Sequence, residues 1–404
     1  MGKNRTEFAR HWPLVMACAI GIGIGVSSLP FYTQGLFIEA WIADFGWTRA
    51  EASLGVLGST IALAAISPTI GAAVDRYGLL KPVAFGLAGL TLSLILFALF
   101  IQSVVIFVIL SVTMAVLAGA SSPLAYTRAI NSVFDKQRGL ALGITLSGTG
   151  IGAAIAPPIV SDLISQYGWR GAYHAMALFT AIAGILIIWI LSRLEGTKAP
   201  PKADAAAIKT AFKQASKTRT YWTLLSAVFL MAFGFGGLII HFVPVLLETG
   251  IETASAARIA GIIGIAVILG RILVGAAVDR IFAPYVGAFA ILCCLSGALG
   301  LAVIGSAIAM PAAFAIGFAI GAEVDLIGYL VSRYFKMAAY GRLYGRQYAA
   351  FLLGTGASPV LLGAIRDATG NYTASLFTAS AILAVSAILF LTLPKFEAGP
   401  SPKA

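Results

Sequence analysis

Charged residues are scarce in this chain of 404 residues, because Asp, Glu, Lys and Arg together make up only 11% of it. A soluble domain carries roughly 25%. Hydrophobic residues make up 59%, which is more than one soluble core could bury. They come in runs of about 20 residues, the length that crosses a hydrocarbon layer of roughly 30 Å. This pattern excludes a soluble globular protein and predicts a membrane-embedded one.

Cysteine and histidine are also scarce, with three residues of each. The cysteines, Cys18, Cys293 and Cys294, all lie in apolar runs. They show neither a disulfide framework nor a metal-ligand spacing. Three scattered histidines do not supply the His/Asp or His/Cys cluster that a membrane-embedded enzyme needs, and no Walker A pattern is present. We therefore expect a protein that is not an enzyme and holds no metal or cofactor.

The apolar runs predict twelve transmembrane helices, each bounded by charged or turn residues. The expected spans are 14–38, 51–74, 81–101, 104–130, 139–165, 171–192, 221–248, 256–279, 284–306, 308–334, 342–366 and 371–393. The early apolar stretch lacks a clear cleavage site, so we interpret it as the first span rather than a signal peptide.

The net charge of +11 is distributed in a way that indicates membrane orientation rather than a nucleic-acid partner. The odd-numbered loops carry only four basic residues, Arg49, Arg170, Arg258 and Arg366. Nearly all other Lys and Arg residues lie in the termini, the even-numbered loops and the helix ends beside them. By the positive-inside rule, we expect a multi-pass protein of the cell membrane with both termini in the cytoplasm.

The six-residue string GAAVDR occurs twice, at 71–76 and at 275–280, half a chain length apart. The spacing from Gly143 to Pro157 is likewise repeated from Gly345 to Pro359. The chain thus contains two similar halves in the same order, an arrangement typical of secondary transporters. We predict a half at 1–192, a cytoplasmic linker at 193–220 with a short amphipathic helix near 204–218, and a half at 221–404. The linker either is plainly solvated or binds anionic headgroups.

Twelve spans with G-x-x-x-D-R after spans two and eight resemble the major facilitator superfamily. The resemblance implies an all-α membrane fold of two six-helix halves related by a parallel pseudo-two-fold axis. It also implies that the repeated motif stabilises one conformation of the carrier and so has a gating role. The residues concerned are Gly71, Asp75, Arg76, Gly275, Asp279 and Arg280. The alternative is that the arginines only anchor the helix ends at the membrane surface.

Three further segments narrow the resemblance. F-G-W-T-R-A at 45–50, R-G-L-A-L-G at 138–143 and Y-G-W-R at 167–170 are similar to segments of monocarboxylate porters and oxalate/formate-type antiporters. Animal members have a Lys in span one and an Asp four residues before the Arg of span eight. This chain lacks the Lys and has Val267 in place of the Asp. The proton-coupling arrangement of the animal members therefore does not carry over.

Arg271 is the most informative polar residue, because it lies deep inside span eight among apolar residues. A buried charge in a membrane helix normally faces a cavity or a partner, and a guanidinium can hold a carboxylate through two parallel hydrogen bonds. The resemblance implies that the matching Arg binds a substrate carboxylate. The alternatives are a structural pair with Glu323 or Asp325, or snorkelling toward the cytoplasm.

Other polar residues within the spans are candidates for the same site. Glu323 and Asp325 in span ten either carry a proton or balance Arg271 or Arg333. His241 in span seven, and Tyr32 and Gln34 in span one, either bind substrate or pack against their neighbours. We therefore predict a monomeric secondary transporter of small organic anions, such as monocarboxylates, that works with H⁺ or by exchange. The alternative is efflux of lipophilic compounds.

Overall fold

The computed structural model describes residues 7–134, 138–194, 205–278, 280–335 and 340–396. Within these ranges the only regular elements are helices. The first half of the chain contains α1 (Glu7–Ile24), α2 (Leu29–Phe45), α3 (Arg49–Tyr77), α4 (Leu80–Phe100), α5 (Val104–Ala118), η1 (Gly119–Ser121), α6 (Pro123–Val133) and α7 (Arg138–Arg193). The rest contains α8 (Ala205–Ala215), α9 (Arg219–Glu248), α10 (Thr253–Val278), α11 (Ala283–Ile304), η2 (Gly305–Ile308), α12 (Ala309–Tyr334), α13 (Tyr340–Thr369) and α14 (Thr373–Leu391).

Ten stretches of the described chain are long and apolar enough to cross a membrane, and two of them are 53 and 52 residues long. A straight helix of that length would measure about 80 Å, far more than a bilayer. Each long stretch reverses at a glycine with positive φ, Gly168 (φ 69°) in α7 and Gly305 (φ 78°) after α11. Each therefore contains two crossings, so the described part of the chain forms the twelve crossings that the sequence predicts.

Two of the crossings are broken in the middle, and the breaks pack against each other. The chain between α1 and α2 is irregular around Gly25, and η1 interrupts the span made of α5 and α6. The Val26 N–H donates to Ser121 Oγ at 3.1 Å. A side chain on Gly25 would place its Cβ 2.1 Å from the Ser121 carbonyl oxygen. Backbone groups freed inside the membrane are thus satisfied by a neighbouring break rather than by lipid.

The two halves repeat the same helix packing. The helix α1 packs on the first part of α7 as α9 packs on α13, and α3 packs on α5 as α10 packs on α12. The halves meet mainly where α3 contacts α13 and where α7 contacts α10. Each of these contacts is the counterpart of the other in the repeat, as a parallel internal repeat requires.

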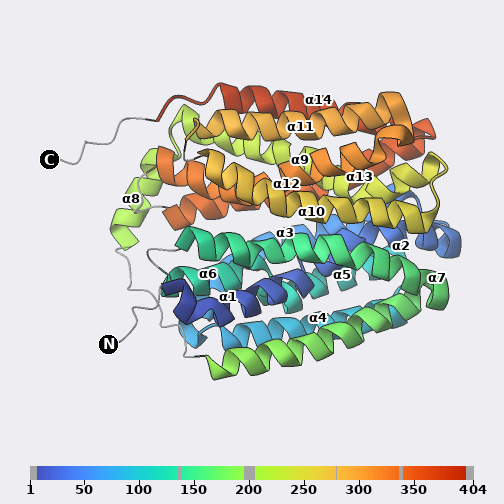
Figure 1. Ribbon diagram of the computed structural model, residues 1–404, viewed down its shortest axis with the longest axis horizontal. Helices are drawn as coiled ribbons and strands as arrows, with labels where there is room; N and C mark the ends of the chain where they lie inside the picture. Colours follow the sequence, from blue (N-terminus) through green and yellow to red (C-terminus); the bar gives the residue numbers. More distant parts are fainter. Residues whose placement is uncertain (1–6, 135–137, 195–204, 279, 336–339, 397–404) are drawn as a thin grey trace.

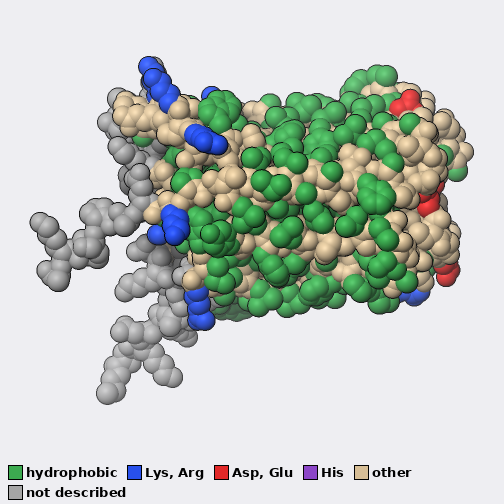
Figure 2. Space-filling model, turned by 90° about the horizontal axis from the view of Figure 1, so that it is seen from above, with side chains coloured by type: hydrophobic (Ala, Val, Ile, Leu, Met, Phe, Trp, Pro, Cys, Tyr) green, Lys and Arg blue, Asp and Glu red, His purple; other side chains and the backbone are tan. Residues whose placement is uncertain are grey.

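The helices run side by side, so the molecule has two distinct ends (Figure 1). We call the end with α8, Glu7 and Leu391 the α8 end, and the opposite one the distal end. Figure 2 shows Lys and Arg side chains gathered toward the α8 end and hydrophobic side chains over the middle of one face. Large apolar residues such as Phe85, Ile185 and Phe289 are exposed on the outside of the bundle, as a lipid-facing belt requires.

The predicted amphipathic linker helix is present as α8. It contacts α13, and the Arg346 guanidinium lies 4.8 Å from the Phe212 ring centroid. The predicted domain boundaries at 192–193 and 220–221 stay predictions.

Candidate substrate site between the two halves

Arg271 lies in α10 and reaches from the second half of the chain to the first. Its side chain is buried, and Nη2 donates to Thr149 Oγ1 of α7 at 3.3 Å. The residue thus faces the interface between the halves rather than lipid, which is the environment expected for a functional charge in a membrane helix.

Small residues bring α12 close to Arg271. A Cβ on Gly321 would lie 3.1 Å from the Arg271 backbone nitrogen, and one on Gly270 would lie 2.3 Å from the Phe318 carbonyl oxygen. Such small-residue contacts let membrane helices approach backbone to backbone. Glu323 follows Gly321 by two residues and is buried. A buried acid and a buried base are therefore carried by two helices in direct contact.

Two tyrosines complete this group. Tyr32 of α2 lies within electrostatic range of both Glu323 and Arg271, and Tyr348 of α13 lies within range of Glu323. We call Arg271, Thr149, Glu323, Tyr32 and Tyr348 the central cluster. It combines one guanidinium, one carboxyl group and three hydroxyl groups from five different helices.

Thr149 and Tyr348 are the members of the central cluster that the sequence analysis did not identify. The Tyr348 ring stacks on Tyr344 and on Phe351, with centroids 6.0 and 5.7 Å apart. The signal was the spacing of Tyr344 and Tyr348, because residues four apart share one helix face. That spacing is common in helix cores, so it did not single out a site.

Gln34 and His241 make other contacts in this conformation. Gln34 Nε2 donates to the Ala52 carbonyl of α3 at 3.3 Å. His241 Nε2 donates to the Pro359 carbonyl at 2.8 Å, since a carbonyl can only accept. Its Nδ1 lies 2.8 Å from the Tyr372 hydroxyl. Burial raises the pKa of Tyr372, so its hydroxyl stays protonated and can donate to a neutral His241. The predicted role of both residues in substrate binding stays a prediction.

Glycines reveal where the halves are pressed together. A Cβ on Gly264 of α10 would lie 2.1 Å from the Ala154 nitrogen and 2.4 Å from the Gly150 oxygen of α7. In the other contact, a Cβ on Gly363 of α13 would lie 2.8 Å from the Ala50 nitrogen of α3. Backbones therefore touch across the interface from its middle to the distal end.

Glycines of the same helices nearer the α8 end make no such close contact. A Cβ on Gly143, Gly275 or Gly345 would meet no described atom within 4 Å. These residues lie on α7, α10 and α13, which are three of the four helices that form the interface. The close glycine contacts described between the halves therefore lie in the middle of the interface and at the distal end.

Charged side chains tie the halves together at the distal end. We call Glu39, Arg49, Glu248, Arg366 and Asp367 the distal ion-pair cluster. Arg49 Nη2 lies 2.8 Å from Glu39 Oε1 and 4.0 Å from Glu248 Oε1, while Arg366 Nε lies 2.5 Å from Glu248 Oε1. Asp367 Oδ2 accepts from the Ala50 N–H at 3.1 Å. A carboxylate of one half therefore caps the N-terminus of a helix in the other.

The Major Facilitator Superfamily model matches residues 20–345, which is more than half of the chain. The chain belongs to this superfamily. It is therefore a multi-pass membrane protein of a transporter family, and the prediction of a protein that is not an enzyme is confirmed.

Similarity to named proteins supports the branch that the motifs indicate. Monocarboxylate transporter 12 from Xenopus laevis is 30% identical over 302 residues, covering 66% of this chain and 64% of that protein. Monocarboxylate transporter 11 from Mus musculus is 26% identical over 402 residues, covering 95% and 88%. The match therefore spans slightly less than two thirds of the first of these relatives. The resemblance to the monocarboxylate branch is confirmed.

Solved structures share the fold at low identity. A D-xylose–proton symporter has a TM-score of 0.73 at 15% identity, with 95% of this chain and 98% of that chain covered. A bacterial homolog of the human lysosomal transporter Spinster, inward-facing and unoccupied, has a TM-score of 0.70 at 15% identity, with 97% and 98% covered. These likenesses confirm the predicted superfamily fold.

The repeated superfamily motif lies at the α8 end. Gly71 is buried in α3, Arg76 lies over the Tyr77 ring at 5.2 Å, and Arg280 is exposed. Gly275 faces open space. Asp279 and the side chains of Asp75 and Asp325 lie outside the described residues. The gating role of the motif and the proton-coupling role of Glu323 and Asp325 stay predictions.

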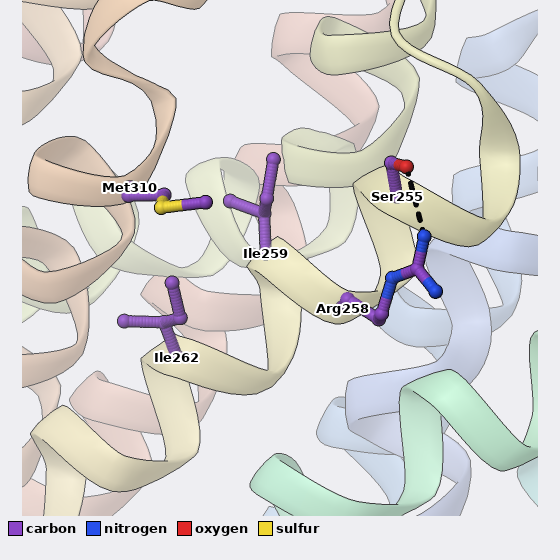
Figure 3. Close-up of a pocket in the computed structure, with 5 residues that line it drawn as sticks. All are labelled: Ser255, Arg258, Ile259, Ile262 and Met310. Atoms are coloured by element: carbon purple, nitrogen blue, oxygen red, sulfur yellow. Dashed lines mark hydrogen bonds between the residues drawn. The ribbon is translucent and has the colours of Figure 1, made fainter.

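A hollow lies beside the first turns of α10, and none of the residues that line it belongs to the central cluster (Figure 3). It has a volume of about 330 Å³ and is lined by Ser255, Arg258, Ile259, Ile262 and Met310. Arg258 Nη2 donates to Ser255 Oγ at 3.1 Å. Because its lining is mostly apolar and its arginine is already engaged, this hollow is a weaker candidate for an anion site than the central cluster.

Proposed function

We propose that this superfamily member is a secondary transporter of small organic anions, with monocarboxylates as the substrate class. The observation that carries the proposal is the buried Arg271 guanidinium at the interface of the two halves. A substrate bound there would contact both halves at once, which is the position from which it can influence their relative movement. The similarity to proteins named monocarboxylate transporters supports the same substrate class.

The chemistry of the central cluster fits a small anion with one carboxylate. One guanidinium matches one carboxylate through two parallel hydrogen bonds, and the hydroxyls of Tyr32 and Tyr348 can bond a substrate hydroxyl or keto group. Arg271 and an ionised Glu323 sum to zero charge, so a bound monocarboxylate would leave one negative charge within the membrane. Protonation of Glu323 would remove that charge. The proposal therefore includes H⁺ coupling through Glu323, with anion exchange as the other mode.

Alternating access follows from the asymmetry of the interface. The distal ion-pair cluster and the close glycine contacts would separate when the central cluster opens to the distal side, and the opposite ends of the same helices would then come together. With both termini in the cytoplasm, as the distribution of Lys and Arg predicts, a conformation held closed at the distal end faces inward.

The test is uptake of short carboxylates into proteoliposomes by the wild type and by Arg271→Lys. The variant keeps the charge and loses the planar two-point geometry, so we expect KM to rise by about tenfold or more. An uncharged lipophilic compound serves as the comparison substrate. Near-normal carboxylate transport by the Lys variant would overturn recognition by Arg271, and transport of the lipophilic compound alone would favour efflux.

A further inference from the structure

Arg271 forms a hydrogen bond with a side chain of the opposite half. Thr149 of α7 accepts a hydrogen bond from Arg271 Nη2 at 3.3 Å, and both side chains are buried. The next residue, Gly150, packs so closely on α10 that a Cβ there would lie 2.6 Å from Ile268 Cγ1 and 2.8 Å from the Gly264 carbonyl oxygen. The bond therefore lies beside one of the tightest contacts between the halves.

This bond lies close to the tight glycine contacts between the halves. Gly150 directly follows Thr149, and Gly264 lies about two turns before Arg271 on α10. Gly143 and Gly275, which lie between this bond and the α8 end, meet no described atom at the Cβ position. A change in the angle between the halves would alter the separation of Thr149 and Arg271.

The orientation of the Thr149 hydroxyl is determined by its own helix. Oγ1 donates its proton to the Leu146 carbonyl at 2.8 Å. A hydroxyl has one proton and two lone pairs, so the lone pairs are left for an outside donor. Thr149 is thus arranged as an acceptor for the guanidinium.

We propose that Thr149 is a positioning residue for substrate binding, an inference that rests on the proposed function of Arg271. A guanidinium has five N–H donors in a rigid plane, and Thr149 engages one of its nitrogens. By holding this nitrogen, Thr149 helps to fix the guanidinium plane in the orientation in which it would meet a carboxylate. Because Thr149 and Arg271 lie on different halves, this orientation holds only while the halves keep their present arrangement at this level. Substrate affinity is therefore coupled to the conformation of the carrier.

The experiment compares Thr149→Val, which keeps the shape and removes the acceptor, with Thr149→Ser, which keeps the acceptor. Thr145→Val is the matched control, since Thr145 is buried one turn earlier on α7 and its hydroxyl has no partner among the described residues. The readouts are KM and maximal rate for exchange of a labelled short carboxylate in proteoliposomes. We expect Thr149→Val to raise KM about tenfold, as for loss of a hydrogen bond to a charged group. The maximal rate should stay within about twofold, since the lost interaction is a binding interaction. The Ser variant and the Thr145 control should behave like the wild type.

A double-mutant cycle with Arg271→Lys identifies the route of the effect. Lys has no guanidinium plane to fix, so adding Thr149→Val to the Lys variant should change KM or the binding constant little. Equal effects of Thr149→Val in both backgrounds, a Ser variant as impaired as the Val variant, or an unchanged KM in Thr149→Val would each overturn the positioning role. If Arg271→Lys itself transports normally, the proposed function fails first. If the Lys variant is impaired and Thr149→Val is normal, only the role of Thr149 fails.

Discussion

Arg49 of α3 and Glu248 of α9 face each other across the two halves, with Nη2 and Oε1 4.0 Å apart. Glu248 also binds Arg366 and accepts from the backbone N–H of Tyr372 at 3.1 Å. It therefore connects the start of α3 with the ends of α9 and α13 and the beginning of α14. Arg49 belongs to the F-G-W-T-R-A segment, so the structure shows a contact for a motif residue that the sequence analysis left without a role.

Glu248→Gln should loosen the distal end. The substitution removes the charge that Arg49 and Arg366 share and keeps the side-chain size. The reporter is Leu57→Cys, introduced into both the parent and Glu248→Gln. We expect a membrane-impermeant thiol reagent on the distal side to modify this cysteine several times faster in Glu248→Gln than in the parent, because an ion pair of this exposure contributes on the order of 1 kcal/mol. Leu57 of α3 lies beside Gly356 of α13 at the interface. The native cysteines Cys18, Cys293 and Cys294 are first replaced by alanine.

Glu51→Gln is the matched control for this prediction. Glu51 also lies at the distal end, but its carboxylate accepts from the Thr48 N–H at 2.9 Å within its own helix. Its replacement should leave the modification rate unchanged. Equal rates in Glu248→Gln and the parent would show that the distal ion-pair cluster does not hold the halves together.

Gly264→Ala should destabilise the conformation described. The new methyl group would overlap backbone atoms of Ala154 and Gly150, which have no flexible end to move aside. We expect a cost of about 1–3 kcal/mol, seen as a lower Tm in detergent. Gly345→Ala is the control because its methyl group meets open space. Helix propensity favours alanine over glycine by up to about 1 kcal/mol, so its Tm should stay equal or rise. A lower Tm in the control alone would contradict the close backbone contact described at Gly264.

Tyr372→Phe should lower stability without weakening substrate binding. It removes the hydroxyl that bonds the buried His241 Nδ1 at 2.8 Å, and a buried group left unsatisfied costs about 1–3 kcal/mol. We expect a Tm lowered by a few degrees and an unchanged KM. In Tyr334→Phe, the hydroxyl lost is bonded to the Pro394 carbonyl in an exposed setting, so the Tm should change less. A raised KM at normal Tm would instead place His241 in the substrate site.

Glu323→Gln should abolish accumulation driven by a pH gradient while exchange continues. One proton moved with each substrate makes the wild type accumulate about tenfold per pH unit at equilibrium. The Gln side chain cannot titrate, so its vesicles should only equilibrate, whereas exchange of labelled for unlabelled substrate needs no proton release. Asp325→Asn, two residues along α12, is the comparison. Accumulation by the Gln variant but not by the Asn variant would assign the proton to Asp325.

The sequence by itself determined the class of the protein, the number of its spans and its division into two similar halves. These properties depend on local hydropathy and on repeated sequence segments, both of which can be identified directly in the sequence. The depth of Arg271 also follows from its position in an apolar run, because a helix of known rise places each residue along the membrane normal. The same reasoning identified Glu323 and Tyr32, since an isolated polar group in such a run stands out.

Only the tertiary structure decided which helices meet, which end is closed and which side chains share a site. Thr149 and Arg271 are more than 100 positions apart, as are His241 and Tyr372. Their contacts depend on the rotation of each helix about its axis and on the crossing of the halves. A membrane helix is mostly apolar on every side, because one side faces lipid and the other faces neighbouring helices. The sequence therefore does not show how each helix is rotated. Backbone contacts at glycines determine it instead, and they exist only once the helices have packed.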